Sequence, residues 1–150
     1  MLNERDDFYL RMAVEFAQGS FHRGWIPIAA VIADDLSIIA TGVNRRVDAN
    51  SMIRHAEMEA LEQAGRNQVA RVRGSCMYTT LSPCLMCTGA VLLFGVKRVV
   101  IADVTTHSGG IDMLRRSGVE TVVQESPVAV RLMAEFTTAQ PDLWAEDNGR

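Results

Sequence analysis

Apolar residues occur along the 150-residue chain in two patterns, at helical spacing and in continuous runs. Turn residues separate these segments. Phe8, Met12 and Phe16 recur at helical spacing and predict a first helix over residues 6–18. Two continuous apolar runs follow, joined by two aspartates, and they predict a hairpin. The expected strands are residues 26–33, 36–43, 75–80, 96–102 and 119–124.

Further helices are expected where apolar stretches are closed by glycine or opened by proline. They cover residues 56–63, 83–94, 111–117, 127–138 and 141–146, and residues 44–54 form a polar loop. Strands that alternate with helices indicate a sheet covered on both faces. We therefore predict an α/β fold, a three-layer α/β/α sandwich with a mixed five-stranded sheet. The first two strands should pair antiparallel and the later ones parallel, within one domain over residues 1–150.

Composition and charge narrow the class of protein. Hydrophobic residues make up 48% of the chain and charged residues 22%, as is ordinary for a globular domain. A net charge of −3 and a pI near 5.6 argue against a broad nucleic-acid face. No apolar run approaches the roughly 18–20 residues that cross a bilayer, and the acidic start does not resemble a signal peptide. We expect a cytoplasmic protein without a membrane partner.

Two short motifs carry candidate chemistry, and each one opens a predicted helix. They read His55-Ala56-Glu57 and Pro83-Cys84-Leu85-Met86-Cys87. Cysteines three positions apart share one helix face, and the positive end of a helix favours thiolates. Two thiolates and an imidazole suit Zn²⁺, and three protein ligands leave one tetrahedral position for water. The sequence therefore predicts a catalytic zinc site on His55, Cys84 and Cys87.

Glu57 is the candidate proton carrier. At the first turn of a helix it can lie beside His55 and reach past it toward the water site. Zinc lowers the pKa of bound water from about 15.7 to about 7, and a neighbouring carboxylate can move the released proton. These groups together can hydrolyse an amidine-like C–NH2 bond.

Other interpretations of the cysteines stay open at this point. The C-x-x-C could be a redox pair, although Pro83 precedes it and no thioredoxin-like flanking residues accompany it. It could also belong to a closed structural zinc site with Cys76 or His107 as fourth ligand. Cys76 itself lies on a predicted strand, where a buried apolar role is expected.

The ordered pair H-x-E and P-C-x-x-C is the signature of zinc nucleobase deaminases. From Asn44 to Arg150 the sequence resembles the cytidine deaminase superfamily, most closely the fungal-type cytosine deaminases. The resemblance is strongest over Tyr78–Gly95, YTTLSPCLMCTGAVLLFG, and returns in Pro141–Gly149, PDLWAEDNG.

The resemblance implies several substrate contacts. Asn44 would recognise the pyrimidine edge, Asp147 the exocyclic amine, and Trp144 would close over the base. It also implies a contact at Ser82. The backbone N–H groups of Ala56 and Cys84 would serve the ring oxygen and the attacking oxygen, respectively. Without the resemblance, Asn44 would be a turn residue, and the two tail residues would belong to an ordinary polar terminus.

Two positions depart from the fungal pattern. Ala56 stands where glycine is usual, which should be tolerated because only its backbone is used. His107 falls where an aromatic residue stacks on the base, and histidine can also hydrogen-bond or carry charge.

The sequence therefore predicts a zinc-dependent aminohydrolase that converts free cytosine to uracil and ammonia. Alternatives are another free heterocycle (isoguanine, guanine, a triazine or a modified pyrimidine) and tRNA adenosine. A zinc-stabilised interaction module without catalysis is the non-enzyme alternative. The polar loop of residues 44–54 also carries Arg45, Arg46 and Arg54, which we expect to be solvated. Alternatively they could contact a phosphate, which would favour a nucleic-acid substrate. By resemblance we expect a homodimer formed through the helices around residues 83–94.

Overall fold

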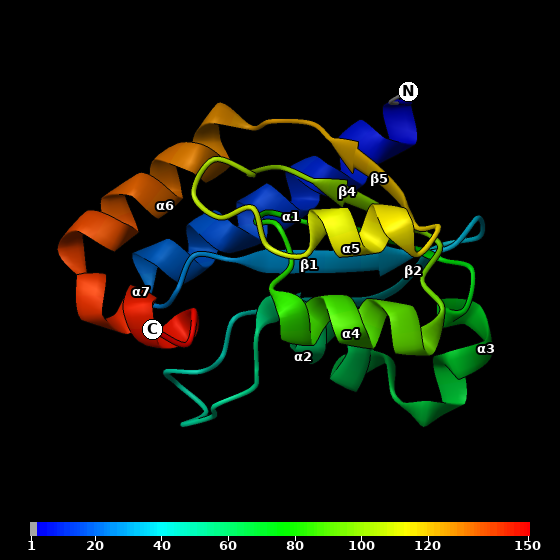
Figure 1. Cartoon of the computed structure of the whole chain (residues 1–150), viewed down its shortest axis with the longest axis horizontal. Coiled ribbons are helices and arrows are strands. Elements are labelled where there is room, and N and C mark those ends of the chain that lie inside the picture. The colour runs from blue at the N-terminus through cyan, green and yellow to red at the C-terminus, as the bar shows by residue number, and fades with distance from the viewer. Residues whose placement is uncertain (1–2) are drawn as a thin grey trace.

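The computed structural model describes residues 3–150 and is built around one mixed sheet (Figure 1). Its strands are β1 (Ala29–Ala33), β2 (Ile38–Val43), β3 (Cys76–Thr79), β4 (Arg98–Ile101) and β5 (Glu120–Val123). The strand order is β2-β1-β3-β4-β5. β1 pairs antiparallel with both β2 and β3, whereas β3, β4 and β5 are mutually parallel. The predicted mixed five-stranded sheet is confirmed.

Helices cover both faces of the sheet. They are α1 (Glu4–His22), α2 (Ala56–Ala64), α3 (Val69–Val72), α4 (Leu85–Phe94), α5 (Ile111–Arg116), α6 (Pro127–Ala139) and α7 (Pro141–Asp147). α1 and α6 pack on one face, and α2, α4 and α5 on the other (Figure 1). α7 follows α6 and turns back toward the edge of the sheet where α2 and α4 begin. The predicted three-layer sandwich is confirmed.

Alternation along the central strands divides the apolar residues between two cores. Ile32 and Met77 face the core under α2 and α4, whereas Val31 and Tyr78 face the core under α1. Successive strand residues point to opposite faces, so a strand covered on both sides reads as a continuous apolar run. This is why the central strands were visible in the sequence.

Most boundaries differ from expectation by one to four residues, and three of the differences are informative. α1 continues past Gly19 to His22, and in this last turn Ser20 is buried and Phe21 packs against the core. β1 begins only at Ala29, since Pro27 has no N–H to donate to a ladder. Cys84 is the N-cap of α4, so Pro83 precedes the helix instead of opening it. The short 3₁₀ turn Arg66–Gln68 and α3 were not predicted.

Gly42 lets α2 lie directly on β2. A Cβ atom at this position would sit 2.4 Å from the carbonyl oxygen of Ala56 and from the backbone nitrogen of Ala60. No side chain fits there, so the glycine sets the depth at which the start of α2 is seated. Within residues 3–150, no helix is long and apolar enough to cross a membrane.

Candidate active site

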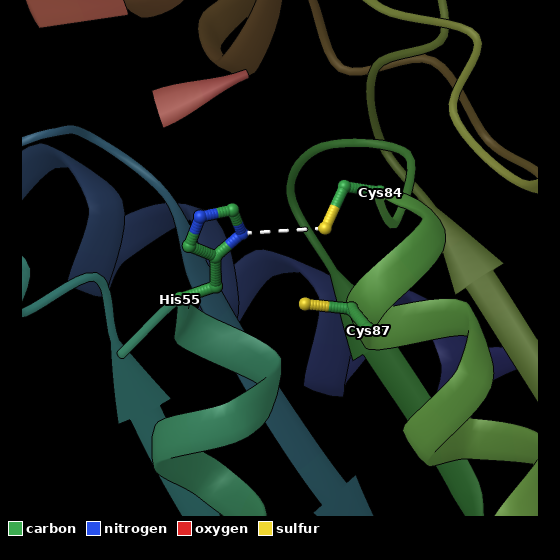
Figure 2. Close-up of side chains that lie close together, drawn as sticks. All are labelled: His55, Cys84 and Cys87. Atoms are coloured by element: carbon green, nitrogen blue, oxygen red, sulfur yellow. Dashed lines mark hydrogen bonds between the residues drawn. The ribbon is translucent and has the colours of Figure 1, made fainter. Parts of the chain in front are cut away.

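The two predicted motifs meet where α2 and α4 begin, at the carboxyl end of β3 (Figure 1). His55 is the N-cap of α2, Cys84 is the N-cap of α4, and Cys87 lies in the first turn of α4. One ligand atom from each lies within 4.8 Å of the others, and Figure 2 shows the three side chains converging. His55 Nδ1 is 3.4 Å from Cys84 Sγ. Among the described residues, these three form the one such cluster of metal-ligating groups.

The three groups of the cluster differ in the direction of their pKa shifts. Hydrogen bonds from Cys87 and His55 lower the pKa of Cys84 to about 4, against the opposing effect of burial. The same shared hydrogen bond and burial raise the pKa of Cys87. Burial lowers the pKa of His55, but the Cys84 hydrogen bond and the charges of Asp147 and Glu57 raise it by more. One imidazole and two cysteine sulfurs are a donor set that Zn²⁺ prefers, so the residues fit this metal.

The second ring nitrogen of His55 also faces a partner. His55 Nε2 lies 3.5 Å from Asp147 Oδ1, and the carboxylate comes from the last residue of α7. A metal-binding histidine is usually held this way, with its free N–H directed at a carboxylate. This contact fixes Nδ1 as the nitrogen that faces the cysteines.

Glu57 is a buried carboxylate in the first turn of α2, with 3% of its surface exposed. The hydroxyl of Thr79, at the end of β3, donates to Glu57 Oε1 at 2.7 Å. Burial raises the pKa of Glu57, and the Thr79 hydrogen bond and the His55 charge only partly oppose this. A carboxyl whose pKa is raised takes up a proton more readily than an ordinary glutamate, which suits a group that carries protons.

A narrow pocket opens beside this cluster. Its walls combine predicted residues with three that were not predicted. They are Ile28, Asn44, His55, Glu57, Leu81, Ser82, Cys84, His107, Asp147 and Asn148. Ala56, Cys87 and Trp144 are buried next to the pocket without lining it. Ala56 is fully buried, consistent with a position where only the backbone matters.

The segment that carries His107 is hydrogen-bonded to the residues that precede α4. The Ser82 hydroxyl donates to the Ser108 carbonyl at 2.6 Å, so this group is engaged with the protein backbone. Gly109 has a φ of 57°, and a Cβ there would lie 2.2 Å from the Pro83 carbonyl oxygen. The glycine therefore permits the close approach that brings His107 to the pocket.

His107 and Trp144 form an aromatic pair at the side of the pocket that His107 lines. The rings of His107 and Trp144 meet edge to face, with centroids 6.4 Å apart and an interplanar angle of 86°. The edge-to-face geometry is a favourable one for aromatic rings. Trp144 lies in α7, so this contact joins the His107 segment to the C-terminal helix.

Asn44 is almost completely buried where β2 ends. Its backbone N–H donates to Ile28 O at 2.9 Å, and its side-chain Nδ2 donates to Asp147 Oδ1 at 3.0 Å. Asn44 Oδ1 accepts from the Arg46 backbone N–H at 3.0 Å. Asn44 therefore joins the loop after β2 to α7.

Sequence reasoning missed four residues of the site. Ile28 belongs to an expected strand, and Leu81 and Asn148 lie in the two stretches that carry the resemblance, but none of the three was given a role in the site. Thr79 could have been suspected because it follows the same face of β3 as Met77, toward α2.

The comparisons with known proteins agree with this geometry. The family model "Cytidine and deoxycytidylate deaminase zinc-binding region" matches residues 3–103. Cytosine deaminase of Candida albicans is 41% identical over 141 residues, covering 93% of this chain and 94% of that protein. The tRNA-specific adenosine deaminase of Buchnera aphidicola is 37% identical over 101 residues, covering 67% of each chain.

Solved structures give the same fold. Guanine deaminase from Nitrosomonas europaea superposes with a TM-score of 0.75 at 22% identity, covering 92% of this chain and 87% of that one. The chain belongs to the cytidine and deoxycytidylate deaminase family. It is a zinc-dependent hydrolytic deaminase, with His55, Cys84 and Cys87 positioned to bind the metal. The interpretations as a redox pair and as a non-catalytic interaction module are therefore set aside.

Proposed function

We propose that this protein deaminates a free nucleobase, with cytosine as the first choice, to give uracil and ammonia. The observation that carries the proposal is the set of polar groups around the narrow pocket. An amide from Asn44 and carboxyl groups from Glu57 and Asp147 face one small space. Cytosine offers a carbonyl, a ring nitrogen and an exocyclic amine along one edge, which matches an amide and two acids. The 41% identity to a cytosine deaminase over 93% of the chain supports the same substrate.

The chain's own residues account for the proton movements. Zinc, when bound, supplies a hydroxide nucleophile at neutral pH. Glu57 takes a proton from the attacking water as the oxygen bonds to the ring carbon, and it delivers this proton to the ring nitrogen. It then takes the second proton from the added hydroxyl and passes it to the amine, so that the C–N bond breaks with release of ammonia. Asp147 accepts from the exocyclic amine, and Asn44 orients the ring. The buried Ala56 and the half-buried Cys84 lie at the starts of the two helices, where their backbone N–H groups can act as donors.

The substrate class follows from what closes the pocket. α7 and the His107 segment contact each other through Trp144 and His107, and His107 and Asp147 line the pocket. A pocket closed in this way should have no room for a ribose on the base. We therefore expect free bases to react and cytidine, deoxycytidine and single-stranded nucleic acid not to react. A single deaminase domain over residues 1–150 and a cytoplasmic location stay predictions.

His107 supports a second candidate, a heterocycle other than cytosine. Its ring can stack on a base, but its nitrogens can also bind a substituent that cytosine lacks. If it only stacks, His107→Phe should keep or improve cytosine turnover. If it reads a substituent, His107→Phe should abolish activity on the true substrate.

An ammonia-release screen tests the proposal. Zinc-loaded protein would be incubated with cytosine, guanine, isoguanine, triazines, the matching nucleosides and single-stranded nucleic acid. The wild type and His107→Phe are compared over the same panel, with Glu57→Gln as the inactive control. Turnover of cytosine without turnover of cytidine is expected. Good turnover of another ring with no turnover of cytosine would defeat the cytosine assignment.

We also propose that two copies associate through α4. This helix exposes Leu85 and Leu93, the latter 71% exposed, and ends at Phe94. Phe94 also lines an apolar groove between α2 and α3, so the exposed surface is continuous. Exposed apolar patches of this kind mark protein interfaces. Sedimentation of the wild type as a dimer, with Leu93→Glu monomeric, would support this; a monomeric wild type would refute it.

A further inference from the structure

One arginine of the loop after β2 is buried against the C-terminal helix. Only 7% of the Arg46 side chain is exposed, and its guanidinium reaches three residues, one in its own loop and two on α7. Arg46 Nε donates to the Met52 carbonyl at 3.0 Å, within the same loop. Nη2 lies 3.1 Å from Glu146 Oε1, and Nη1 lies 3.5 Å from Asp147 Oδ1, both on α7. The expectation of a solvated loop is therefore wrong for this residue.

The preceding arginine behaves differently. Arg45 is 37% exposed and pairs with Asp48, three positions away, at 2.7 Å. This pair is local to the loop, and exposed pairs of this kind contribute little to stability. Arg45 Nη1 also lies 3.8 Å from Oε1 of Glu59, a buried carboxylate on α2. The two neighbouring arginines therefore differ in the helix that they reach, which is α2 for Arg45 and α7 for Arg46.

Arg46 acts on the pocket from both its backbone and its side chain. Its backbone N–H donates to Asn44 Oδ1, which leaves the Asn44 Nδ2 group facing Asp147. Its guanidinium supplies positive charge to a carboxylate that is only 3% exposed. A buried carboxylate is costly unless charged or hydrogen-bonding groups compensate it. The same carboxylate also faces the His55 ring, so its position matters to the whole site.

We propose that Arg46 is a positioning residue, which holds α7 and the Asp147 carboxylate in place over the substrate pocket. The inference rests on the proposed function in one respect, that α7 closes over a small substrate. With α7 held in place, binding does not have to order it, and preorganisation of this kind raises affinity. A guanidinium suits the task because its fixed fork can address three directions at once, whereas a lysine ammonium is a point charge.

The test compares Arg46→Ala and Arg46→Lys with Arg45→Ala as the matched control. Each variant is made in a Trp25→Phe background, so that Trp144 becomes the sole tryptophan and reports on α7. Steady-state kinetics on the best base from the panel give KM and kcat. Acrylamide quenching of tryptophan fluorescence, measured without substrate, gives the accessibility of Trp144.

For Arg46→Ala we expect KM to rise by about tenfold or more, because a buried ion pair is broken, while kcat changes less. Quenching of Trp144 should increase in parallel. Arg46→Lys should lie between Arg46→Ala and the wild type. Arg45→Ala, which leaves the contacts with α7 in place, should match the wild type in Trp144 quenching. Equal quenching of Trp144 in the two alanine variants would overturn the proposal.

A second variant covers the case in which Arg46→Ala does not fold. Glu146 is 65% exposed, so Glu146→Gln removes one partner without opening the core. It should raise KM and Trp144 quenching by about twofold, the size expected for a partly exposed pair. No change in either readout would overturn the proposal. If no base in the panel is deaminated, the proposed function fails, and the substrate-free quenching series still decides the role of Arg46.

Discussion

Gly42→Ala tests how closely α2 must pack on β2 for the active site to keep its geometry. The added Cβ would lie 2.4 Å from backbone atoms of Ala56 and Ala60, and ordinary contact begins near 3.4 Å. Both contacts are backbone atoms of α2, which cannot rotate away as a side chain can. The start of α2 must therefore shift outward by about 1 Å. Overpacking of this kind costs about 1–3 kcal/mol of unfolding free energy. For a chain of this size the Tm should fall by about 2–12 °C.

The same shift would displace His55 and Glu57, which stand at the start of α2. A misplacement of about 1 Å in an active site can cost about 100-fold in rate. We therefore expect kcat/KM to fall by about 100-fold while most of the zinc is retained, as measured by elemental analysis. Gly19→Ala is the control, because its Cβ meets nothing within 4 Å and a helical alanine should raise stability slightly. A Gly42→Ala protein with wild-type Tm and kinetics would refute the reasoning.

Four further outcomes are expected. Cys84→Ala should lose zinc by elemental analysis, and full retention would contradict the ligand assignment. Glu57→Gln should keep zinc but lose about 10²–10⁴-fold in kcat, and loss of less than about tenfold would be inconsistent with its role. Removal of Asp142–Arg150 should leave zinc bound but cripple turnover of the free base; unchanged kinetics would mean that α7 does not close the pocket. Burial raises the pKa of Asp6, but hydrogen bonds from Arg98 lower it by more, to below its usual 3.8. The ionised carboxylate therefore stabilises the fold above about pH 4, and this contribution is lost as pH falls further; urea unfolding of Asp6→Asn should show a shallower loss below pH 4.

The sheet and the metal cluster could be predicted because their signals are local. Each central strand is covered on both faces and so reads as an apolar run, and Gly95 marks the end of α4. The ligands need only two helix starts to be brought together, because Cys84 and Cys87 share one turn. The α/β/α layering then places both helix starts at the same edge of the sheet.

The contacts that close the pocket could not be predicted from patterns. Arg46 meets Glu146 across 100 positions, and nothing in a polar loop distinguishes it from Arg45. The need for glycine at position 42 appears only when α2 is laid on β2. Asn44, Trp144 and Asp147 were identified by resemblance, because an asparagine after a strand and a polar tail carry no chemistry of their own.

The metal-binding and proton-carrying residues, the first half of the site, lie on one part of the chain, and the residues expected to close over the substrate, the second half, lie on another. Membership of the family therefore accounts for the reaction but not for the substrate. The family match ends at residue 103, after the zinc cluster and Glu57 but before His107, Trp144 and Asp147. The first half sits at the starts of helices packed on the sheet, and it supplies chemistry that works on any suitably placed C–NH2 group. The second half consists of the His107 segment and α7. Contacts of α7 with Arg46 and Asn44 join it to the loop after β2. Relatives named for cytosine and for tRNA adenosine both match this chain, so the shared zinc motifs do not choose the ring. We expect the choice to depend on Asn44 together with His107 and α7.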